Sequence, residues 1–227
     1  MTATLLSRRA LLAYGSSALL AGCVARMGPP TSSDIIMPVD PEASAMPDLV
    51  DLAQFDPRLR FDIRYATPDN FLHRTLYPVA RALAQRPVAE ALRRVQSAAE
   101  AEGLGLLIFD AYRPWRITKM MWDGTSGEAR GYVANPATGS RHNRGCAIDL
   151  SLVRLSDGRV LAMPSAFDDL TFRARRENMD ASTEAIANRA TLERLMVAGG
   201  FIPLPSEWWH FDWHDWRLYP IMDQPLG

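Results

Sequence analysis

Residues 140–152 read Ser-Arg-His-Asn-Arg-Gly-Cys-Ala-Ile-Asp-Leu-Ser-Leu, and this stretch decides the fold that we predict. The residues from Ala147 to Leu152 alternate strictly, which predicts a strand with its even-numbered side chains toward the core. Asp149 then lies on the other face, where burying its carboxylate costs several kcal/mol unless a positive partner compensates. A divalent cation is the strongest such partner. We therefore expect Asp149 and His142, with Gly145 between them, to aim at one metal ion.

A second segment, Glu207-Trp208-Trp209-His210, brings one more histidine, and its aromatic residues favour a strand. His210 would complete a three-ligand set with His142 and Asp149. Two neutral imidazoles and one carboxylate suit zinc, and three protein ligands leave the fourth position open, as catalytic sites do. The sequence therefore predicts one catalytic zinc ion per chain.

Glu207 decides whether such a site is catalytic. It stands three residues before His210, and residues at odd offsets on a strand point to opposite faces. Both can reach the metal only if Glu207 lies at a bend entering the strand, and Pro203 and Pro205 favour such a bend. A carboxylate beside the metal that is not a ligand is placed to act as general base and later return a proton to the leaving amine.

The four histidines of the chain allow other roles as well. His210 and His214 have the i, i+4 spacing of a helical metal-binding pair, but the aromatic alternation around them favours a strand. Either metal segment alone is a common coincidence, whereas two segments that together supply ligands and a base are not. We interpret His73 and His214 as structural or surface residues.

The rest of the chain predicts a mixture of helices and strands without a repeating βαβ pattern. A helix starts at Pro87 and ends at Gly103, because its apolar residues recur at helical spacing. Further helices are expected over 114–122 and 183–198, and a buried strand over 104–109. The expected class is α+β, with a central antiparallel sheet flanked by helices.

Composition excludes several classes of protein. The chain has 227 residues, of which 48% are hydrophobic and 22% charged, and its formal net charge is −1. These values are typical of a soluble globular domain, and the near-neutral charge gives no indication of a nucleic-acid partner. Two cysteines cannot form a disulfide framework, and we expect Cys146 to be a small buried residue. The sequence does not indicate an oligomeric state.

The N-terminus resembles an export signal of the lipoprotein type. Residues 1–22 contain Arg8 and Arg9 before an apolar run too short to span a membrane. The following Leu-Ala-Gly-Cys resembles a lipobox, in which Cys23 is acylated and becomes the mature N-terminus. Residues 23–48 are proline-rich and predict a flexible tether, which leaves one domain over 49–227. We expect a cell-envelope protein on the periplasmic side, held to the membrane by its lipid only.

Two motifs resemble those of a known family. Residues 140–149 match S-x-H-x-x-G-x-A-x-D and residues 207–210 match E-x-W-H, the signatures of zinc D-alanyl-D-alanine peptidases with the hedgehog-related fold. Residues 64–71, 110–114 and 166–168 resemble further motifs of D-alanyl-D-alanine dipeptidases of the VanX type. The resemblance extends from about residue 49 to about residue 220.

The resemblance implies a role for each of several residues. It places zinc on His142, Asp149 and His210, with Glu207 as the base. Arg113 is similar to the arginine that stabilises the tetrahedral oxyanion, which suits a permanently charged fork of donors. Asp168 would bind the ammonium group of the substrate. Ser140 and Trp208 would line the substrate cavity, with the serine toward the C-terminal carboxylate.

These implications predict a zinc dipeptidase that cleaves D-Ala-D-Ala to two D-alanines in peptidoglycan metabolism. A longer or acylated peptide would place no charge at Asp168 and would collide with the cavity wall. One rival is a D,D-carboxypeptidase or endopeptidase acting on peptidoglycan stem peptides, and another is a non-catalytic zinc-containing lipoprotein. Residues 122–131, 134–139 and 169–173 differ from the resistance enzymes of the family, so the breadth of accepted substrates is less defined than the chemistry.

Overall fold

The computed structural model describes residues 35–227. The expected export signal over 1–22 and the lipidation site Cys23 lie outside these residues. Within 35–227, none of the helices combines the length and the apolar composition needed to cross a membrane.

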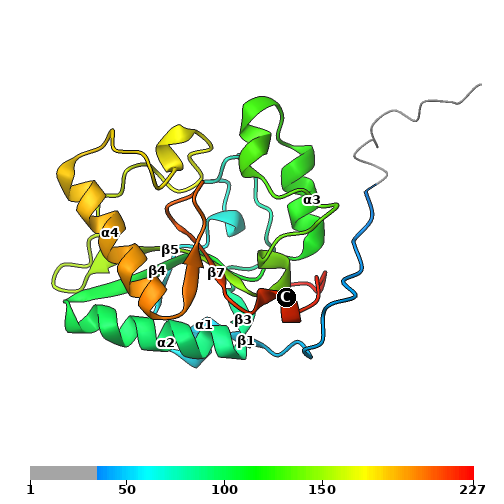
Figure 1. The fold of residues 1–227 in the computed structure, drawn as a ribbon, viewed down its shortest axis with the longest axis horizontal. Helices are drawn as coiled ribbons and strands as arrows, with labels where there is room; N and C mark the ends of the chain where they lie inside the picture. Colours follow the sequence, from blue (N-terminus) through cyan, green and yellow to red (C-terminus); the bar gives the residue numbers. More distant parts are fainter. Residues whose placement is uncertain (1–34) are drawn as a thin grey trace, which may run out of the picture.

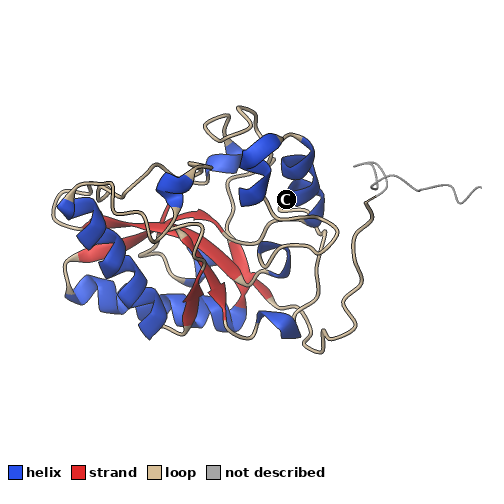
Figure 2. Ribbon diagram, turned by 45° about the horizontal axis from the view of Figure 1, so that its top comes forward, coloured by secondary structure: helices blue, strands red, loops and turns tan. Residues whose placement is uncertain are grey.

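The described chain forms two sheets surrounded by four α-helices (Figures 1 and 2). The strands are β1 (Leu49–Asp51), β2 (Arg60–Phe61), β3 (Leu83–Gln85), β4 (Leu104–Asp110), β5 (Ala147–Arg154), β6 (Phe201–Pro203) and β7 (His210–Trp213). The α-helices are α1 (Leu52–Phe55), α2 (Arg86–Ala101), α3 (Trp115–Asp123) and α4 (Thr183–Ala198). Short 3-10 turns are η2 (Arg64–Ala66), η3 (Gly127–Tyr132), η4 (His142–Arg144), η5 (Phe172–Ala174) and η6 (Trp216–Leu218).

The larger sheet has the strand order β2-β4-β5-β7-β6, and a small second sheet pairs β1 with β3. The pairs β4–β5, β5–β7 and β6–β7 are antiparallel, as predicted, whereas β2 pairs in parallel with β4. The central strands are therefore antiparallel as predicted, and the parallel pairing of β2 at one edge is a further detail that the sequence did not predict. The connection between β2 and β4 includes α2, and a connection of that length allows two strands to run in the same direction.

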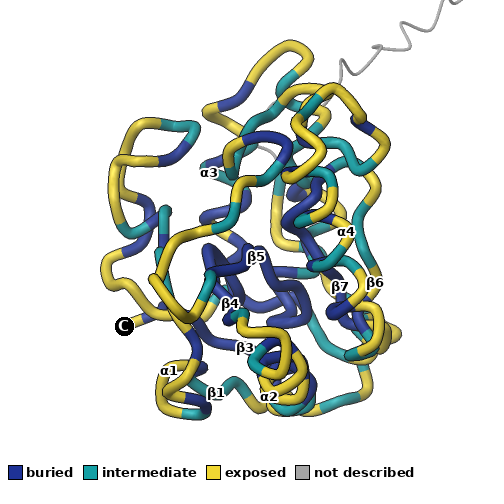
Figure 3. Tube along the Cα trace, turned by 90° about the vertical axis from the view of Figure 1, so that its left-hand side faces the viewer, coloured by how far each residue is buried: buried dark blue, intermediate teal, exposed yellow. Residues whose placement is uncertain are grey.

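The predicted α+β class is confirmed, and the three long predicted helices correspond to α2, α3 and α4. α2 packs against β4 and α4, and lies along one side of the sheet in Figure 1. Its buried face carries Val88, Leu92 and Val95. Fully burying a side chain of this size contributes roughly 1.5–3 kcal/mol. Figure 3 shows that the buried residues concentrate in β4, β5 and β7, so these central strands lie in the core of the domain.

The last residues of the predicted tether, before residue 49, make polar contacts with the domain. The backbone amides of Ser44 and Ala45 both donate to the carbonyl of Leu218. Asp40 forms an ion pair with the buried side chain of Arg144. Polar contacts therefore join this end of the predicted tether to the body of the domain.

A register shift between β4 and β5 aligns the residues that build the site. The regular pairing ends at Ile108, and Asp110 comes to lie opposite Asp149. Such bulges bend a strand and re-aim its side chains, and they are frequent next to active sites. On the other side of β5, Asp149 is paired with His210 of β7. Three acid or imidazole side chains from neighbouring strands therefore meet at one end of the sheet.

Candidate active site

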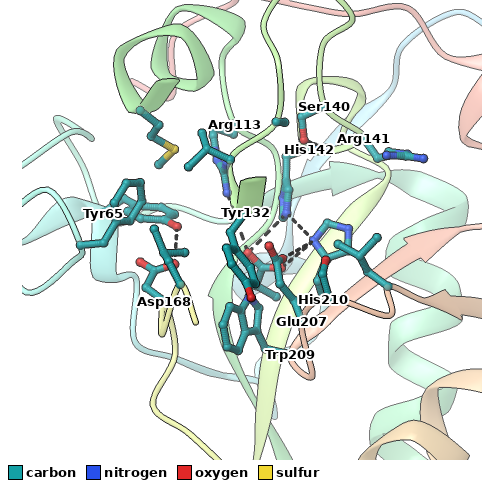
Figure 4. Close-up of a pocket in the computed structure, with 18 of the residues that line it drawn as sticks. Tyr65, Arg113, Tyr132, Ser140, Arg141, His142, Asp168, Glu207, Trp209 and His210 are labelled. Carbon is teal, nitrogen blue, oxygen red and sulfur yellow. Dashed lines mark hydrogen bonds and ion pairs between the residues drawn. The ribbon is translucent and has the colours of Figure 1, made fainter. Parts of the chain in front are cut away.

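A cavity of about 220 Å³ lies at this end of the sheet. This is less than the roughly 300–1,000 Å³ of pockets for drug-sized ligands, so the space suits a small molecule. Residues from separate parts of the chain line it, including Tyr65, Arg113, Asp168, Glu207 and Trp209 (Figure 4). The predicted metal ligands lie on one wall of the same cavity.

The structure brings His142, Asp149 and His210 together. One ligand atom from each residue lies within 4.8 Å of the others, and all three residues are buried. Nε2 of His142 is 3.3 Å from an oxygen of Asp149 and 3.1 Å from Nδ1 of His210. That nitrogen of His210 is in turn 3.0 Å from the second oxygen of Asp149. These donors therefore converge on one point, as the sequence predicted.

Gly145 allows the chain to turn from η4 into β5. It follows η4 with φ of 67°, in the left-handed region that favours glycine. A Cβ at this position would lie only 2.5 Å from Leu49 Cδ2 and 3.3 Å from the backbone nitrogen of Gln85. The tight turn places His142 beside Asp149 although seven residues separate them in the sequence.

Each histidine is oriented by an acceptor on its other ring nitrogen. Nδ1 of His142 donates to the carbonyl of Ala111 at 2.6 Å, which leaves Nε2 free to bind a metal. Nε2 of His210 donates to the carboxylate of Asp212 at 2.9 Å, which leaves Nδ1 free. Metal-binding histidines are usually held in this way, because the outer hydrogen bond fixes the tautomer and the ring orientation. The role of Asp212 was not predicted, although its position two residues after His210 on a strand puts both on one face.

The charges at this point fit a cation. Burial opposes ionisation of Asp149, but the neighbouring histidines outweigh it and hold the pKa of this carboxyl well below its usual range. Burial likewise opposes protonation of His210, but hydrogen bonds to Asp149 and Asp212 raise its pKa to about 10. The surroundings thus favour positive charge between Asp149 and the imidazoles. Two imidazoles and a carboxylate with such surroundings are a donor set that fits zinc.

Glu207 lies in the bend before β7, as its spacing required. One of its oxygens is 3.8 Å from Nδ1 of His210, the nitrogen that faces the ligand cluster. Burial raises the pKa of Glu207 to about 7, although the nearby His210 opposes the shift. A buried carboxyl with a pKa near neutrality is suited to take up and release a proton.

Arg113 follows β4 and reaches the cavity from the side of Asp110. Its Nε and Nη2 donate to one oxygen of Asp110 at 3.0 and 2.7 Å, and the hydroxyl of Tyr77 donates to the other oxygen at 2.7 Å. Nη2 of Arg113 also lies 3.8 Å from Asp149. Asp110 and Tyr77 therefore fix the guanidinium beside the ligand cluster. Neither was predicted to do so, although Asp110 belongs to the segment that resembled a family motif.

Asp168 is a buried carboxyl with one unpartnered oxygen. It has a φ of 62°, in the left-handed region that residues other than glycine seldom adopt. Tyr65 donates a hydrogen bond to Oδ1 at 2.9 Å, whereas Oδ2 has no hydrogen-bond partner. Burial raises the pKa of Asp168 to about 8, against the opposing hydrogen bond from Tyr65. A carboxyl of this kind is a ready partner for a cationic group in the cavity.

Of the two remaining residues predicted to line the cavity, one does so and the other does not. Ser140 lines the cavity and its hydroxyl accepts from the amide of His142 at 3.2 Å. Trp208 does not line it: its indole N–H donates to Ser165 at 3.0 Å and the ring is buried in the core. Trp209 lines the cavity instead, as Figure 4 shows. The prediction was wrong because Glu207 points into the cavity, and as the bend enters the extended strand the residue two positions on shares its side.

The chain is similar to a family of bacterial peptidases. A sequence profile described as D-ala-D-ala dipeptidase matches residues 45–224. The D-alanyl-D-alanine dipeptidase of Escherichia coli (strain K12) is 37% identical over 175 residues, which cover 77% of this chain and 89% of that protein. The D-alanyl-D-alanine dipeptidase of Enterococcus faecium is 34% identical over 183 residues, covering 71% and 89%.

Among solved structures, the chain is similar to a variant of the vancomycin resistance D,D-pentapeptidase VanY in complex with Zn(II). It is 17% identical, with a TM-score of 0.37, over 61% of this chain and 76% of that one.

Proposed function

Because the chain belongs to the D-ala-D-ala dipeptidase family, we propose that it is a metallopeptidase that uses zinc to hydrolyse D-alanyl-D-alanine to two D-alanines. The observation that carries the substrate assignment is the unpartnered oxygen of Asp168 in the same small cavity as the ligand cluster and Glu207. A free dipeptide has an ammonium group close to its one peptide bond, so a carboxylate and a metal site in one small cavity match its chemistry.

His142, Asp149 and His210 would hold the zinc ion, the two imidazoles through the ring nitrogens that the outer hydrogen bonds leave free and the aspartate through its carboxylate. When bound, zinc acts as a Lewis acid that makes water more acidic and polarises a carbonyl group. The carboxylate of Asp212 and the carbonyl of Ala111 fix which ring nitrogen of each imidazole carries a proton, and they aim the other nitrogen at this point.

Glu207 moves the protons. Its buried carboxylate lies beside the ligand cluster without belonging to the three-ligand set. It would take a proton from the attacking water and deliver it to the amine that leaves. A pKa near 7 suits both steps, because the group must accept a proton and then release it at the same pH.

Arg113 stabilises the negative charge that develops on the carbonyl oxygen. Two of its nitrogens are fixed on Asp110, so the guanidinium needs no reorientation during the reaction. Donors that are oriented in advance in a dry cavity account for several kcal/mol of transition-state stabilisation.

Asp168 selects a free N-terminus. The substrate ammonium would pair with the unpartnered Oδ2, while Tyr65 holds Oδ1. An N-acylated peptide offers no charge to this buried carboxyl and therefore leaves it unpaired, which disfavours binding. Ser140 lines the same cavity and is our candidate for a contact with the substrate carboxylate.

The test is an assay of the purified protein on D-Ala-D-Ala and on N-acetyl-D-Ala-D-Ala. We expect turnover of the free dipeptide only, abolished by a chelator and restored by zinc. The Asp168→Asn variant should raise KM for the free dipeptide by about 10- to 100-fold, the value of one hydrogen bond to a charged group. Equal cleavage of both substrates would instead favour a D,D-carboxypeptidase, and turnover that resists chelation would refute the metal mechanism.

We further propose that the protein acts in peptidoglycan turnover at the cell envelope, anchored through a lipid on Cys23. The support is the Arg8-Arg9 pair, the apolar run and the Leu-Ala-Gly-Cys sequence of the N-terminus. A resistance role requires destruction of the dipeptide in the cytoplasm, so export favours turnover. Metabolic labelling with a radioactive fatty acid should label the wild type but not Cys23→Ser, and an unlabelled wild-type protein would refute the anchor.

A further inference from the structure

The loop that carries Glu207 is closed by a side chain from a distant segment. Residues 204–209 connect β6 to β7, and the amide of Leu204 donates to the carbonyl of His210, the first residue of β7, at 3.1 Å. Inside this loop, the amide of Glu207 donates to the carbonyl of Leu204 at 3.3 Å. The carbonyls of Leu204 and His210 thus stand at the two ends of the bend that places Glu207.

Arg176 binds both of these carbonyls. Its Nε donates to the carbonyl of Leu204 and its Nη2 to that of His210, each at 2.9 Å. The backbone amide of Arg176 also donates to the carbonyl of Pro205 at 3.0 Å. One residue therefore supplies three hydrogen bonds to the ends of the loop, and its rigid planar fork fixes the distance between them.

Arg176 is itself firmly held. Its Nη1 forms an ion pair with Glu193 of α4 at 3.0 Å, and its guanidinium lies 4.3 Å from the centre of the Phe211 ring. The side chain is 11% exposed, so it is packed rather than free in solvent. Burial lowers the pKa of Arg176 to about 10, which still leaves the guanidinium charged at neutral pH.

His210 and Glu207 depend on this residue to different degrees. His210 belongs to β7, which pairs with β5 through Asp149, and the neighbouring carbonyl of Trp209 accepts from the amide of Leu150. Glu207 precedes the strand and lacks such pairing with β5. Loss of Arg176 should therefore displace the base more than the metal ligand.

We propose that Arg176 is a positioning residue for the reaction: by joining the carbonyls of Leu204 and His210, it sets Glu207 at its working distance from the metal ligands. This inference rests on the proposed function, because it assigns the arginine to the base of that reaction. Displacing a catalytic group by about 1 Å can cost roughly 100-fold in rate.

The experiment compares Arg176→Met and Arg176→Lys with a control, Arg189→Met. Arg189 is also buried and donates to backbone carbonyls, at Asn178 and Arg175, but does not contact residues 204–210. For Arg176→Met we expect kcat on D-Ala-D-Ala to fall about 10- to 100-fold, with one zinc per chain retained and KM within threefold of the wild type. Arg176→Lys, which keeps the charge but loses the fork, should be intermediate. Arg189→Met should lower the melting temperature but leave kcat within twofold.

Hydrogen exchange supplies a readout that does not depend on activity. In Arg176→Met, and to a smaller extent in Arg176→Lys, the amides of Leu204, Ser206 and Glu207 should exchange several-fold faster, whereas those of β5 should not. An inactive wild type would refute the proposed function but leave this geometric test standing. Unchanged exchange, a kcat within twofold of the wild type, activity restored by excess zinc, or an equal loss of kcat in Arg189→Met would each overturn the role of Arg176.

Discussion

The two segments that meet at the ligand cluster are held in different ways. His142 and Asp149 belong to a turn and a central strand, and β5 has a hydrogen-bonded neighbour on each side. Glu207 lies in a loop beside the edge strand β6, and a side chain from another segment closes that loop. Pairing within the sheet thus builds the metal-binding half, whereas the base lies in a loop that is closed by its own backbone hydrogen bonds together with the side chain of Arg176. We expect substitutions in the loop of Glu207 to lower turnover without loss of metal, and substitutions around the metal ligands to lower metal affinity.

The largest effect that follows is on the rate. Glu207→Gln keeps the shape of the side chain but removes the proton acceptor, and general base catalysis contributes roughly 10²–10⁴-fold. We expect kcat on D-Ala-D-Ala to fall by that factor with one zinc per chain retained. Metal analysis and steady-state kinetics on the same sample check both parts. Loss of zinc together with activity would place Glu207 among the ligands and would contradict the separation of the metal-binding residues from the base.

The next effect is on metal affinity. Asp212→Asn replaces the carboxylate that accepts from Nε2 of His210, and loss of such an outer partner costs about 10- to 100-fold in affinity or activity. We expect zinc to bind that much more weakly in a competition with a chromophoric chelator, and kcat to recover at saturating zinc. As a control, Asp215→Asn alters an exposed neighbouring acid and should leave the affinity unchanged. An equal loss in both variants would contradict the assignment.

A third prediction concerns the pH dependence of stability that arises from Asp168, whose carboxyl group lines the same cavity. The pKa of Asp168 is raised to about 8 in the folded protein, above the ordinary value of an unfolded aspartate. The folded state therefore holds this proton more tightly, and the contribution to stability falls as pH rises from about 4 to about 8. Asp168→Asn removes this dependence, so its stability relative to the wild type should grow with pH.

Urea unfolding at several pH values measures that difference. Its slope should approach, at most, about 1.4 kcal/mol per pH unit, the free energy equivalent of one proton per unit. The difference should level off above pH 8. A difference that stays flat between pH 5 and pH 8 would show that Asp168 ionises normally in the folded protein and would contradict the raised pKa.

The smallest effect is on stability in the metal-binding half. Gly145→Ala forces a side chain into the left-handed region, which costs roughly 1–2 kcal/mol, and also brings Cβ against Leu49. Gly103→Ala is the matched control, since its φ is also positive, at 72°, but nothing lies within 4 Å of its Cβ. Both should unfold more easily, Gly145→Ala more so. Equal free energies of unfolding would mean that the packing behind η4 is unimportant.

The spacing of apolar residues in the sequence predicted those features of the fold and the site that depend on regular helices and strands. The helix over 183–198 matches α4 to the residue, because Ser182 caps its start and Gly199 follows its end. The convergence of His142, Asp149 and His210 followed from strand alternation and from the few residue types that bind zinc. The place of Glu207 at a bend followed from an offset that a regular strand does not allow.

What the sequence did not predict depends on contacts between distant segments. Asp110, Asp212 and Arg176 act through hydrogen bonds whose partners are fixed only by the register of the sheet and the path of the loops. The exchange of Trp208 for Trp209 has the same origin, because the path of the bend decides which of the two side chains faces the cavity. Roles of lipid and export stay predictions, because residues 1–34 lie outside the described part of the chain.

The ion pair between Asp40 and Arg144 has a practical consequence for protein production. Arg144 stands two residues after His142 and also donates to the carbonyl of Tyr219. A shortened protein that started at Leu49 would lack Asp40, so the guanidinium of Arg144 would lose its ion-pair partner next to the turn that carries His142. Expression trials should therefore start upstream of Asp40, and any truncation beyond it should be checked for metal loading before its kinetics are interpreted.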